Sequence, residues 1–287
     1  MNNPLSQAAI EWGHHVWLVY LALLIAGMLA DVFLLVYYYA HPPHWDENAG
    51  LLRQKAAPAG FIVRLLLFLV SIFIVILSAR KIAGAWGGPA VLENEPLWII
   101  VQSVGFHGIG LLAIAGLLKQ FGATWKGVFG LRSKRFFKAL GTGLVFYLAS
   151  MPFLWFYSLL YQAALKHIGY EPSWQEVALV LTGDQPLWIR IYFFFMGIVL
   201  APVFEEVVFR GILLPYFAQK WGVSRSVILI SLLFAGIHFH IPALGPLFVI
   251  SLALSLAYIS TRSILVPIAM HGIFNAVNLT LMLVMRN

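Results

Sequence analysis

The chain has 287 residues, of which 61% are hydrophobic and only 10% are charged, and its formal net charge is +7. Soluble domains hold about 25% charged residues, so this composition predicts an integral membrane protein rather than a soluble one. The absence of cysteine excludes disulfides, iron–sulfur clusters and thiol chemistry. The basic residues do not form the pattern of a nucleic-acid-binding face, so we interpret the positive charge as a determinant of membrane topology.

Eight apolar runs approach the length of about 20 residues that a helix needs to cross a bilayer. We therefore expect an all-α, polytopic membrane protein that forms a single membrane domain over residues 1–287. The sixth and seventh runs are short, and Pro242, Gly245 and Pro246 are expected to break the chain between them. The expected spans are residues 16–40, 60–83, 97–118, 136–162, 187–215, 224–239, 245–261 and 263–285.

The basic residues are divided unevenly between the two sides of this eight-span arrangement. Of the 18 Lys and Arg residues, twelve fall on the side of the loop from Lys119 to Lys138 and five on the side of the two termini. Because Lys and Arg collect in cytoplasmic loops, we expect both termini outside a cell membrane and this loop in the cytoplasm. Binding of anionic lipid headgroups is an alternative role for the same loop.

On the opposite side, residues 166–190 are expected to form a surface loop with a short amphipathic helix. Its polar and aromatic residues include Glu171, Glu176, Trp174 and Trp188. Tryptophans are enriched where a protein meets the membrane surface, so we interpret these two as interfacial anchors.

Three charged side chains, Glu205, Glu206 and Arg210, interrupt the fifth run within six residues. A charge at the bilayer centre costs roughly 2.5–3.5 kcal/mol on insertion scales, so such groups usually face the protein interior and serve a function. Glu206 and Arg210 are four residues apart and can pair along one helix face. Glu205, about 100° further round the helix, is then left for chemistry. Pro202 removes a backbone hydrogen bond and is expected to open the helix just before the acidic pair.

Further polar groups interrupt the later runs. His238 lies near the end of the sixth run, and His271 and Asn275 lie four residues apart on one side of the eighth. A rise of about 1.5 Å per residue puts Glu205, His238 and His271 at similar depths, roughly 12–20 Å from the expected cytoplasmic surface. Three separate helices are thus expected to bring a carboxylate, two imidazoles and an amide to one level, nearer the cytoplasmic side.

These side-chain types predict hydrolysis of a peptide or ester without a covalent intermediate. A carboxylate and a histidine can hold and deprotonate a water, while a second histidine and an amide can donate hydrogen bonds to the oxyanion that forms. We expect no cofactor for this reaction. One glutamate and two histidines could instead ligate a catalytic zinc ion, although the chain has no HExxH motif.

The segments EEVVFR at 205–210, FAGIH at 234–238 and HGIFN at 271–275 resemble the three motifs of the CPBP family, also called the ABI family. That family includes the CAAX prenyl endopeptidases. The motifs occur in the family's order, and the resemblance covers about the last 100 residues, whereas the first 180 residues resemble no family. The resemblance implies an eight-helix, glutamate-dependent intramembrane protease with a catalytic core over residues 187–285.

The resemblance also implies a role for each of six residues. It implies that Glu205 and His238 activate the water and that His271 and Asn275 form the oxyanion hole. Glu206 and Arg210 are then expected to support the site. The implied partners are the lipid bilayer and a membrane-associated protein or peptide substrate, with prenylation of that substrate left open.

Functions of two other classes stay open at this point. A catalytically silent membrane scaffold or immunity protein could use the same fold, and an ion-coupled transporter could use the buried carboxylates as a proton or cation relay. The sequence has no visible internal repeat, which counts against the transporter. Asp31 and His107 stand without matching partners in the first and third runs, and we interpret both as structural.

Overall fold

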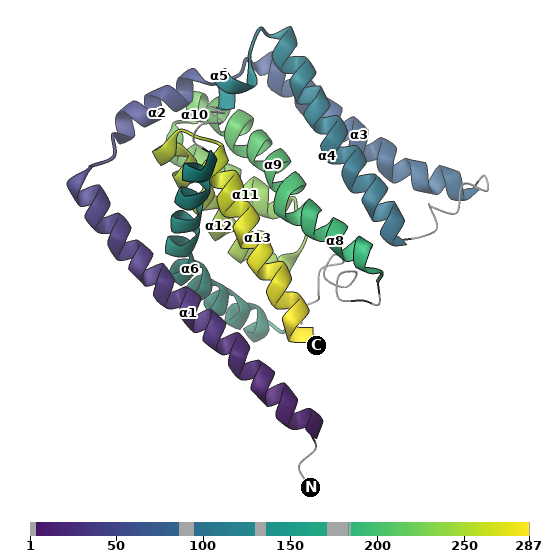
Figure 1. Cartoon of the computed structure of the whole chain (residues 1–287). Coiled ribbons are helices and arrows are strands. Elements are labelled where there is room, and N and C mark those ends of the chain that lie inside the picture. The colour runs from purple at the N-terminus through teal and green to yellow at the C-terminus, as the bar shows by residue number, and fades with distance from the viewer. Residues whose placement is uncertain (1–3, 86–94, 130–135, 171–182, 184, 287) are drawn as a thin grey trace.

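The computed structural model describes residues 4–85, 95–129, 136–170, 183 and 185–286. Every regular element within these residues is a helix (Figure 1). Seven described helices are long and apolar enough to cross a membrane, and α11 is a shorter apolar helix. The prediction of an all-α, polytopic membrane protein is therefore confirmed. The helices are α1 (Pro4–Ala40), α2 (Trp45–Gln54), α3 (Ala59–Ala85), α4 (Glu95–Gln120), α5 (Trp125–Phe129), α6 (Phe136–His167), α8 (Leu187–Phe195), η3 (Met196–Leu200), α9 (Ala201–Glu206), η4 (Val207–Leu213), α10 (Leu214–Trp221), α11 (Val223–Gly236), α12 (Ile241–Thr261) and α13 (Leu265–Arg286).

The bundle is built around α6, α12 and α13, which pack against one another, and α1 covers α6 on the outside. Helices α3 and α4 form a hairpin on the far side from α1, with α8 and α9 between the hairpin and α13 (Figure 1). The outer faces of α1 and α3 expose large apolar side chains, including Leu35 and Leu67. Exposed apolar faces on helices of this length fit contact with lipid.

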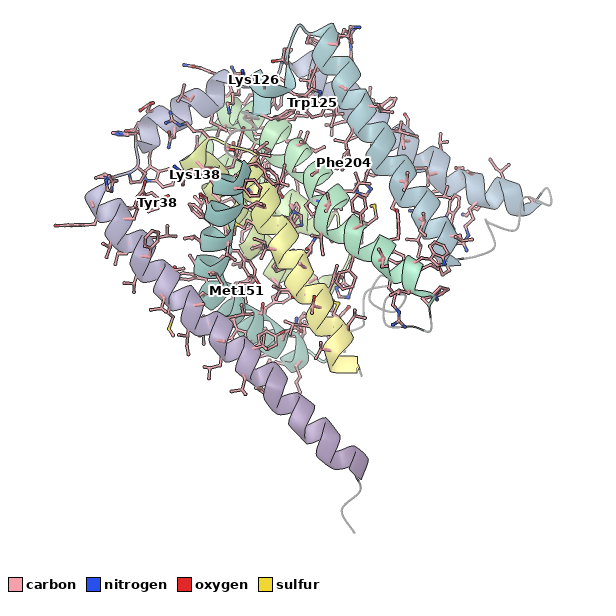
Figure 2. All side chains as sticks on the ribbon, viewed as in Figure 1. Tyr38, Trp125, Lys126, Lys138, Met151 and Phe204 are labelled. Carbon is pink, nitrogen blue, oxygen red and sulfur yellow. The ribbon has the colours of Figure 1, made fainter. Side chains whose placement is uncertain are left out.

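One ring from α9 connects the α3–α4 hairpin to the rest of the bundle. Phe204 points from α9 toward α4 (Figure 2), where its ring meets Phe106 and His107 with centroids 5.4 and 5.1 Å away. Gly110 makes room for it, because a Cβ there would lie 2.5 Å from the Phe204 ring. The Nδ1 atom of His107 bonds to the carbonyl of Ser103 at 2.7 Å.

The two ends of the bundle differ in what they hold. The start of α1 and the end of α13 lie at one end, and α2, α5 and the turn from α12 into α13 lie at the other (Figure 1). Residues 130–135 of the predicted basic loop lie outside the described residues. So does most of the predicted amphipathic segment, with Glu171, Trp174 and Glu176, whereas Trp188 belongs to α8 and is 54% exposed.

The fifth span changes helix type around the acidic pair. It runs continuously over Leu187–Trp221, but two segments of it, η3 and η4, are π-helical. Between them lies the single turn α9, which carries Pro202, Glu205 and Glu206. The predicted opening of the backbone before the acidic pair thus takes the form of a π-helix, which is frequent at functional sites.

The predicted break at Pro242, Gly245 and Pro246 is wrong, because all three lie inside α12 and the break falls at residues 237–240. Pro242 occupies the first turn of α12, where the missing N–H has no helical partner to lose. Pro246 cannot bond to the carbonyl of Pro242, and the side-chain amide of Gln162 in α6 donates to that carbonyl at 2.9 Å instead. A neighbouring helix can thus replace the hydrogen bond that a proline removes.

A second proline shows a related arrangement. Pro152 lies inside α6 and leaves the carbonyl of Leu148, four residues earlier, without its helical donor. Helix α1 packs onto that carbonyl through Gly27, where a Cβ would lie 2.6 Å from the Leu148 oxygen. Only a residue without a side chain allows this approach, so the pairing of Gly27 with Pro152 determines how closely α1 contacts α6.

Candidate active site

A buried ion pair forms the base of the site. Arg210 Nη1 donates to Glu206 Oε1 at 2.8 Å, and both side chains are 0% exposed. The pair predicted from their spacing is therefore present. Arg210 Nη2 also donates to the carbonyl and the hydroxyl of Ser251 on α12, at 3.1 and 2.6 Å. The Phe234 ring covers the guanidinium with its centroid 4.6 Å from Cζ, which favours the cation.

Ser251 is a partner of Arg210 that the sequence did not predict. Its own carbonyl accepts a hydrogen bond from Ser255 at 2.9 Å, and both serines are completely buried. Two serines four residues apart in an otherwise apolar span indicate a polar stripe on one helix face. That stripe was the available indication that α12 faces Arg210.

His271 joins the two neighbouring carboxylates. Its Nδ1 lies 2.9 Å from Glu206 Oε1, and its Nε2 lies 3.8 Å from Glu205 Oε2. Glu206 Oε1 already accepts a hydrogen bond from Arg210, so His271 Nδ1 carries the hydrogen and donates it. This bond fixes the ring so that Nε2 faces Glu205.

Glu205 differs from Glu206 in exposure and in bonding. Its side chain is 18% exposed, whereas that of Glu206 is 0% exposed and bonds through Oε1 to both Arg210 and His271. The 3.8 Å separation from His271 is too long for a hydrogen bond. Both groups can nevertheless contact the same water or substrate oxygen. Glu205 is therefore the carboxylate that is available to a reactant.

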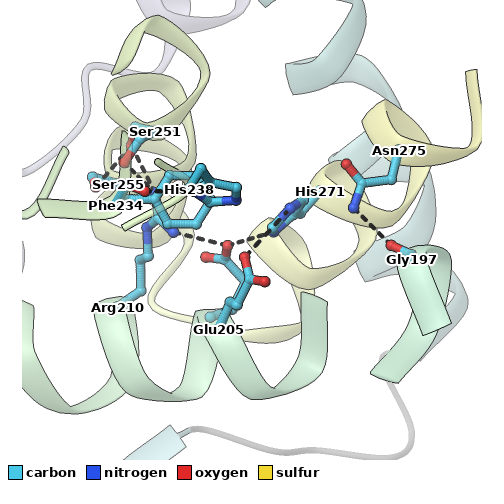
Figure 3. A network of polar contacts seen from close by, with 10 residues as sticks. Gly197, Glu205, Arg210, Phe234, His238, Ser251, Ser255, His271 and Asn275 are labelled. Carbon is cyan, nitrogen blue, oxygen red and sulfur yellow. Dashed lines mark hydrogen bonds and ion pairs between the residues drawn. The ribbon is translucent and has the colours of Figure 1, made fainter. Parts of the chain in front are cut away.

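His238 reaches the same region from the chain that follows α11. Its Nδ1 lies 2.7 Å from the carbonyl of Phe234, and a carbonyl can only accept, so Nδ1 carries the hydrogen. In the neutral ring Nε2 then has the lone pair that a general base needs. The Phe234 ring separates the imidazoles, with its centroid 5.0 Å from that of His238 and 5.6 Å from that of His271. Figure 3 shows the two imidazoles on two sides of the Glu205 carboxylate.

Asn275 lies one turn beyond His271 on α13, and its Nδ2 donates to the carbonyl of Gly197 at 2.7 Å (Figure 3). Gly197 belongs to η3, where the N–H of Ala201 bonds five residues back to Met196. In that register the next donor, to Gly197, would come from residue 202, which is a proline. Asn275 supplies the missing hydrogen bond and keeps a second amide hydrogen and its oxygen for other partners.

The zinc alternative requires several ligating side chains gathered at one point. No group of three or more His, Asp or Glu side chains within the described residues is placed to hold a metal ion. We therefore derive no step through a metal.

Comparison with known families matches only the part of the chain that contains this site. Residues 186–277 match the family model described as Rce1-like, type II CAAX prenyl endopeptidase. These residues, about a third of the chain, are similar to that family. No curated protein and no solved structure matches the chain. All three motifs lie inside the Rce1-like residues, so the match confirms the resemblance found from them and indicates a CAAX-type protease that acts in the membrane on a peptide substrate.

Proposed function

We propose that the protein is an intramembrane endopeptidase in which Glu205 activates a water to hydrolyse a peptide bond of a membrane-associated protein. The contrast between two adjacent carboxylates carries the proposal. Glu206 is 0% exposed, and its Oε1 atom accepts hydrogen bonds from Arg210 and His271, whereas Glu205 is 18% exposed and lies 3.8 Å from its ion-pair partner His271. A membrane-buried carboxylate without a structural partner is costly, and a catalytic role accounts for its presence.

In the proposed reaction Glu205 takes a proton from a water, with His238 Nε2 as a second acceptor that orients it. The water oxygen bonds to the carbonyl carbon of the scissile peptide, and the electron pair of the C=O bond moves onto the carbonyl oxygen. When that oxyanion collapses, the C–N bond breaks and Glu205 returns its proton to the leaving amine. The enzyme ends unchanged, and no covalent intermediate forms.

The oxyanion is proposed to lie against α13. In its protonated form His271 offers an Nε2–H beside Glu205, because its Nδ1–H is already held by Glu206. Asn275 offers the amide hydrogen that Gly197 does not use. Donors of this kind are each worth about 10²–10³ in rate when they are fixed before the reaction, and the hydrogen bonds to Glu206 and Gly197 fix both side chains here.

The proposed substrate is a peptide segment at the membrane surface, cut by an enzyme of the cell membrane whose site opens toward the cytoplasm. The family description adds a prenyl group as the candidate feature that the enzyme recognises. Glu205 and His271 both lie within membrane spans, so a lipid-modified chain end could reach Glu205 from the bilayer.

A panel of peptides tests this proposal. Purified protein in detergent is given peptides that end in a CAAX sequence, each with and without a prenyl group, and products are identified by mass. Cleavage of the prenylated peptides alone supports the hypothesis that the enzyme recognises the prenyl group. Equal cleavage of both forms rejects that hypothesis. A parallel series with a chelator is expected to show unchanged rates, whereas loss of activity that added zinc restores would contradict the glutamate-activated water.

A further inference from the structure

A pocket that shares no residue with the candidate active site lies between α2 and the C-terminal end of α12. Helix α2 connects two spans, because it follows the end of α1 and precedes the start of α3, and it therefore lies at the membrane surface. Apolar side chains of α2 and α12 form the walls of the pocket, and amide, phenol and cationic groups complete it. The lining residues are Asn48, Leu51, Leu52, Lys55, Tyr258, Ile259 and Arg262.

Two of the lining groups are the cations Lys55 and Arg262, and among the described residues only Arg262 has an acidic partner. Arg262 Nη1 pairs with Glu47 Oε1 at 3.1 Å on the exposed side, where both side chains are about half exposed at 50% and 57%. Lys55 is partly buried, and within the described part of the chain its ammonium donates to the Tyr258 hydroxyl at 3.5 Å and lies 5.4 Å from the ring centroid of Tyr258. No carboxylate among the described residues pairs with Lys55.

The ammonium of Lys55 is held in an unfavourable place for a cation. Burial lowers its pKa, and the positive charge of Arg262 lowers that pKa further. A lysine that kept its charge in solvent would avoid both costs by extending away from Arg262. An anion between the two cations would remove the repulsion and replace the hydration that Lys55 has lost.

The backbone of Arg262 gives a second, independent observation. It is the C-cap residue of α12 and adopts the left-handed conformation, with φ at +57°. Helices usually end this way at glycine, because a side chain makes the conformation unfavourable. An arginine there keeps an unfavourable backbone conformation and places its side chain at the pocket, and strain of this kind concentrates at functional positions.

We propose that this pocket binds a phosphate group, with Lys55 and Arg262 as its two cationic donors and the buried amide of Asn48 beside them. A phosphate suits the site because it accepts several charge-assisted hydrogen bonds at once, from a guanidinium fork and from an ammonium. The apolar walls of Leu51, Leu52 and Ile259 border the phosphate, and the rest of a lipid would lie outside the pocket. An anionic phospholipid headgroup and free phosphate share the recognised chemistry, and the experiment separates them.

The test is a binding titration of the full chain in a maltoside detergent, which contains no phosphate. Three probes are used, namely short-chain phosphatidylglycerol, short-chain phosphatidylcholine and inorganic phosphate. Wild type is expected to bind phosphatidylglycerol, and Lys55→Gln to raise its Kd by about tenfold or more, the cost of one charge-assisted hydrogen bond. Arg53→Gln is the matched control, since Arg53 is an exposed cation on the same helix and does not line the pocket.

A second variant distinguishes loss of binding from loss of the folded structure. Arg262→Gly removes the guanidinium and relieves the left-handed strain, so its thermal midpoint without ligand is expected to equal or exceed that of wild type while phosphatidylglycerol binding is lost. Binding of phosphatidylglycerol but not of inorganic phosphate assigns the site to lipid, and binding of both extends it to free phosphate. The proposal is overturned if wild type binds none of the probes. It is also overturned if Arg53→Gln weakens binding as much as Lys55→Gln, or if Arg262→Gly binds as wild type does.

Discussion

Asn275 on α13 donates a hydrogen bond of 2.7 Å to the carbonyl of Gly197, which lies 78 residues earlier in the chain. The helical donor for that carbonyl is missing because residue 202 is a proline. One side chain therefore connects the proline that opens the fifth span to the helix that carries His271. In this account Asn275 both docks α13 and offers its second amide hydrogen to the reaction.

The first prediction concerns that connection. Asn275→Leu should lower the free energy of unfolding in mixed micelles by about 1 kcal/mol, because it leaves the Gly197 carbonyl without a donor. Pro202→Ala restores a backbone N–H in the register of η3, so Asn275→Leu should cost less in that background. Equal costs of Asn275→Leu in both backgrounds would show that the proline and the amide are not coupled.

The second prediction concerns the close contact of α13 with η3. A Cβ on Gly272 would lie 2.6 Å from the carbonyl oxygen of Ile198, which is backbone and cannot rotate away. Gly272→Ala is therefore expected to destabilise the protein by about 1–3 kcal/mol and to reduce cleavage by moving α13. Gly116→Ala is the control, because a Cβ there meets nothing within 4 Å. A Gly272→Ala protein as stable and active as Gly116→Ala would contradict the packing described here.

The third prediction concerns the buried ion pair. Arg210→Met leaves the Glu206 carboxylate in the core without its cation, and such a change costs about 3–5 kcal/mol. Glu206→Gln combined with Arg210→Met removes both charges and keeps an oxygen that can accept from His271 Nδ1, so the double variant should be more stable than Arg210→Met alone. The measurement is the midpoint of thermal unfolding in detergent, and a double variant less stable than Arg210→Met would reject the explanation.

The fourth prediction concerns Lys55 and pH. Its pKa in the folded protein lies below 10.5 because of burial and then Arg262, so the folded state loses this proton before the unfolded state does. The charged ammonium therefore destabilises the folded state fully at pH values below the folded pKa. This destabilisation disappears as the pH rises toward 10.5. Without an anion, Lys55→Met should raise the unfolding free energy near neutral pH and reduce its increase at alkaline pH. An unchanged pH profile would show that Lys55 carries no such cost.

Local spacing predicted part of this molecule well. The apolar runs predicted the spans, because a bilayer requires about 20 apolar residues whatever the helices pack against. The ion pair of Glu206 with Arg210 followed from a spacing of four residues on one helix. Proline rules were less reliable, since Pro246 lies inside α12 where Gln162 of another helix replaces its lost hydrogen bond.

The contacts that complete the site join distant parts of the chain. His271 meets Glu206 across 65 residues, and Ser251 meets Arg210 across 41 residues. Neither pairing follows from periodicity, because both depend on the rotation and depth at which separate helices pack. The three motifs indicated which residues gather, whereas only the fold shows that His271 bonds to the supporting carboxylate and not to Glu205.

The measurement that tests the central claim most directly is the turnover rate of Glu205→Gln on a peptide that wild type cleaves, with the thermal midpoint recorded in the same detergent. Asp31→Asn is the matched control, because Asp31 is another carboxylate within a span and lies on α1. We predict that Glu205→Gln keeps its fold and loses about 10²–10⁴-fold in rate, while Asp31→Asn cleaves like wild type. A folded Glu205→Gln protein that cleaves at the wild-type rate would contradict the account.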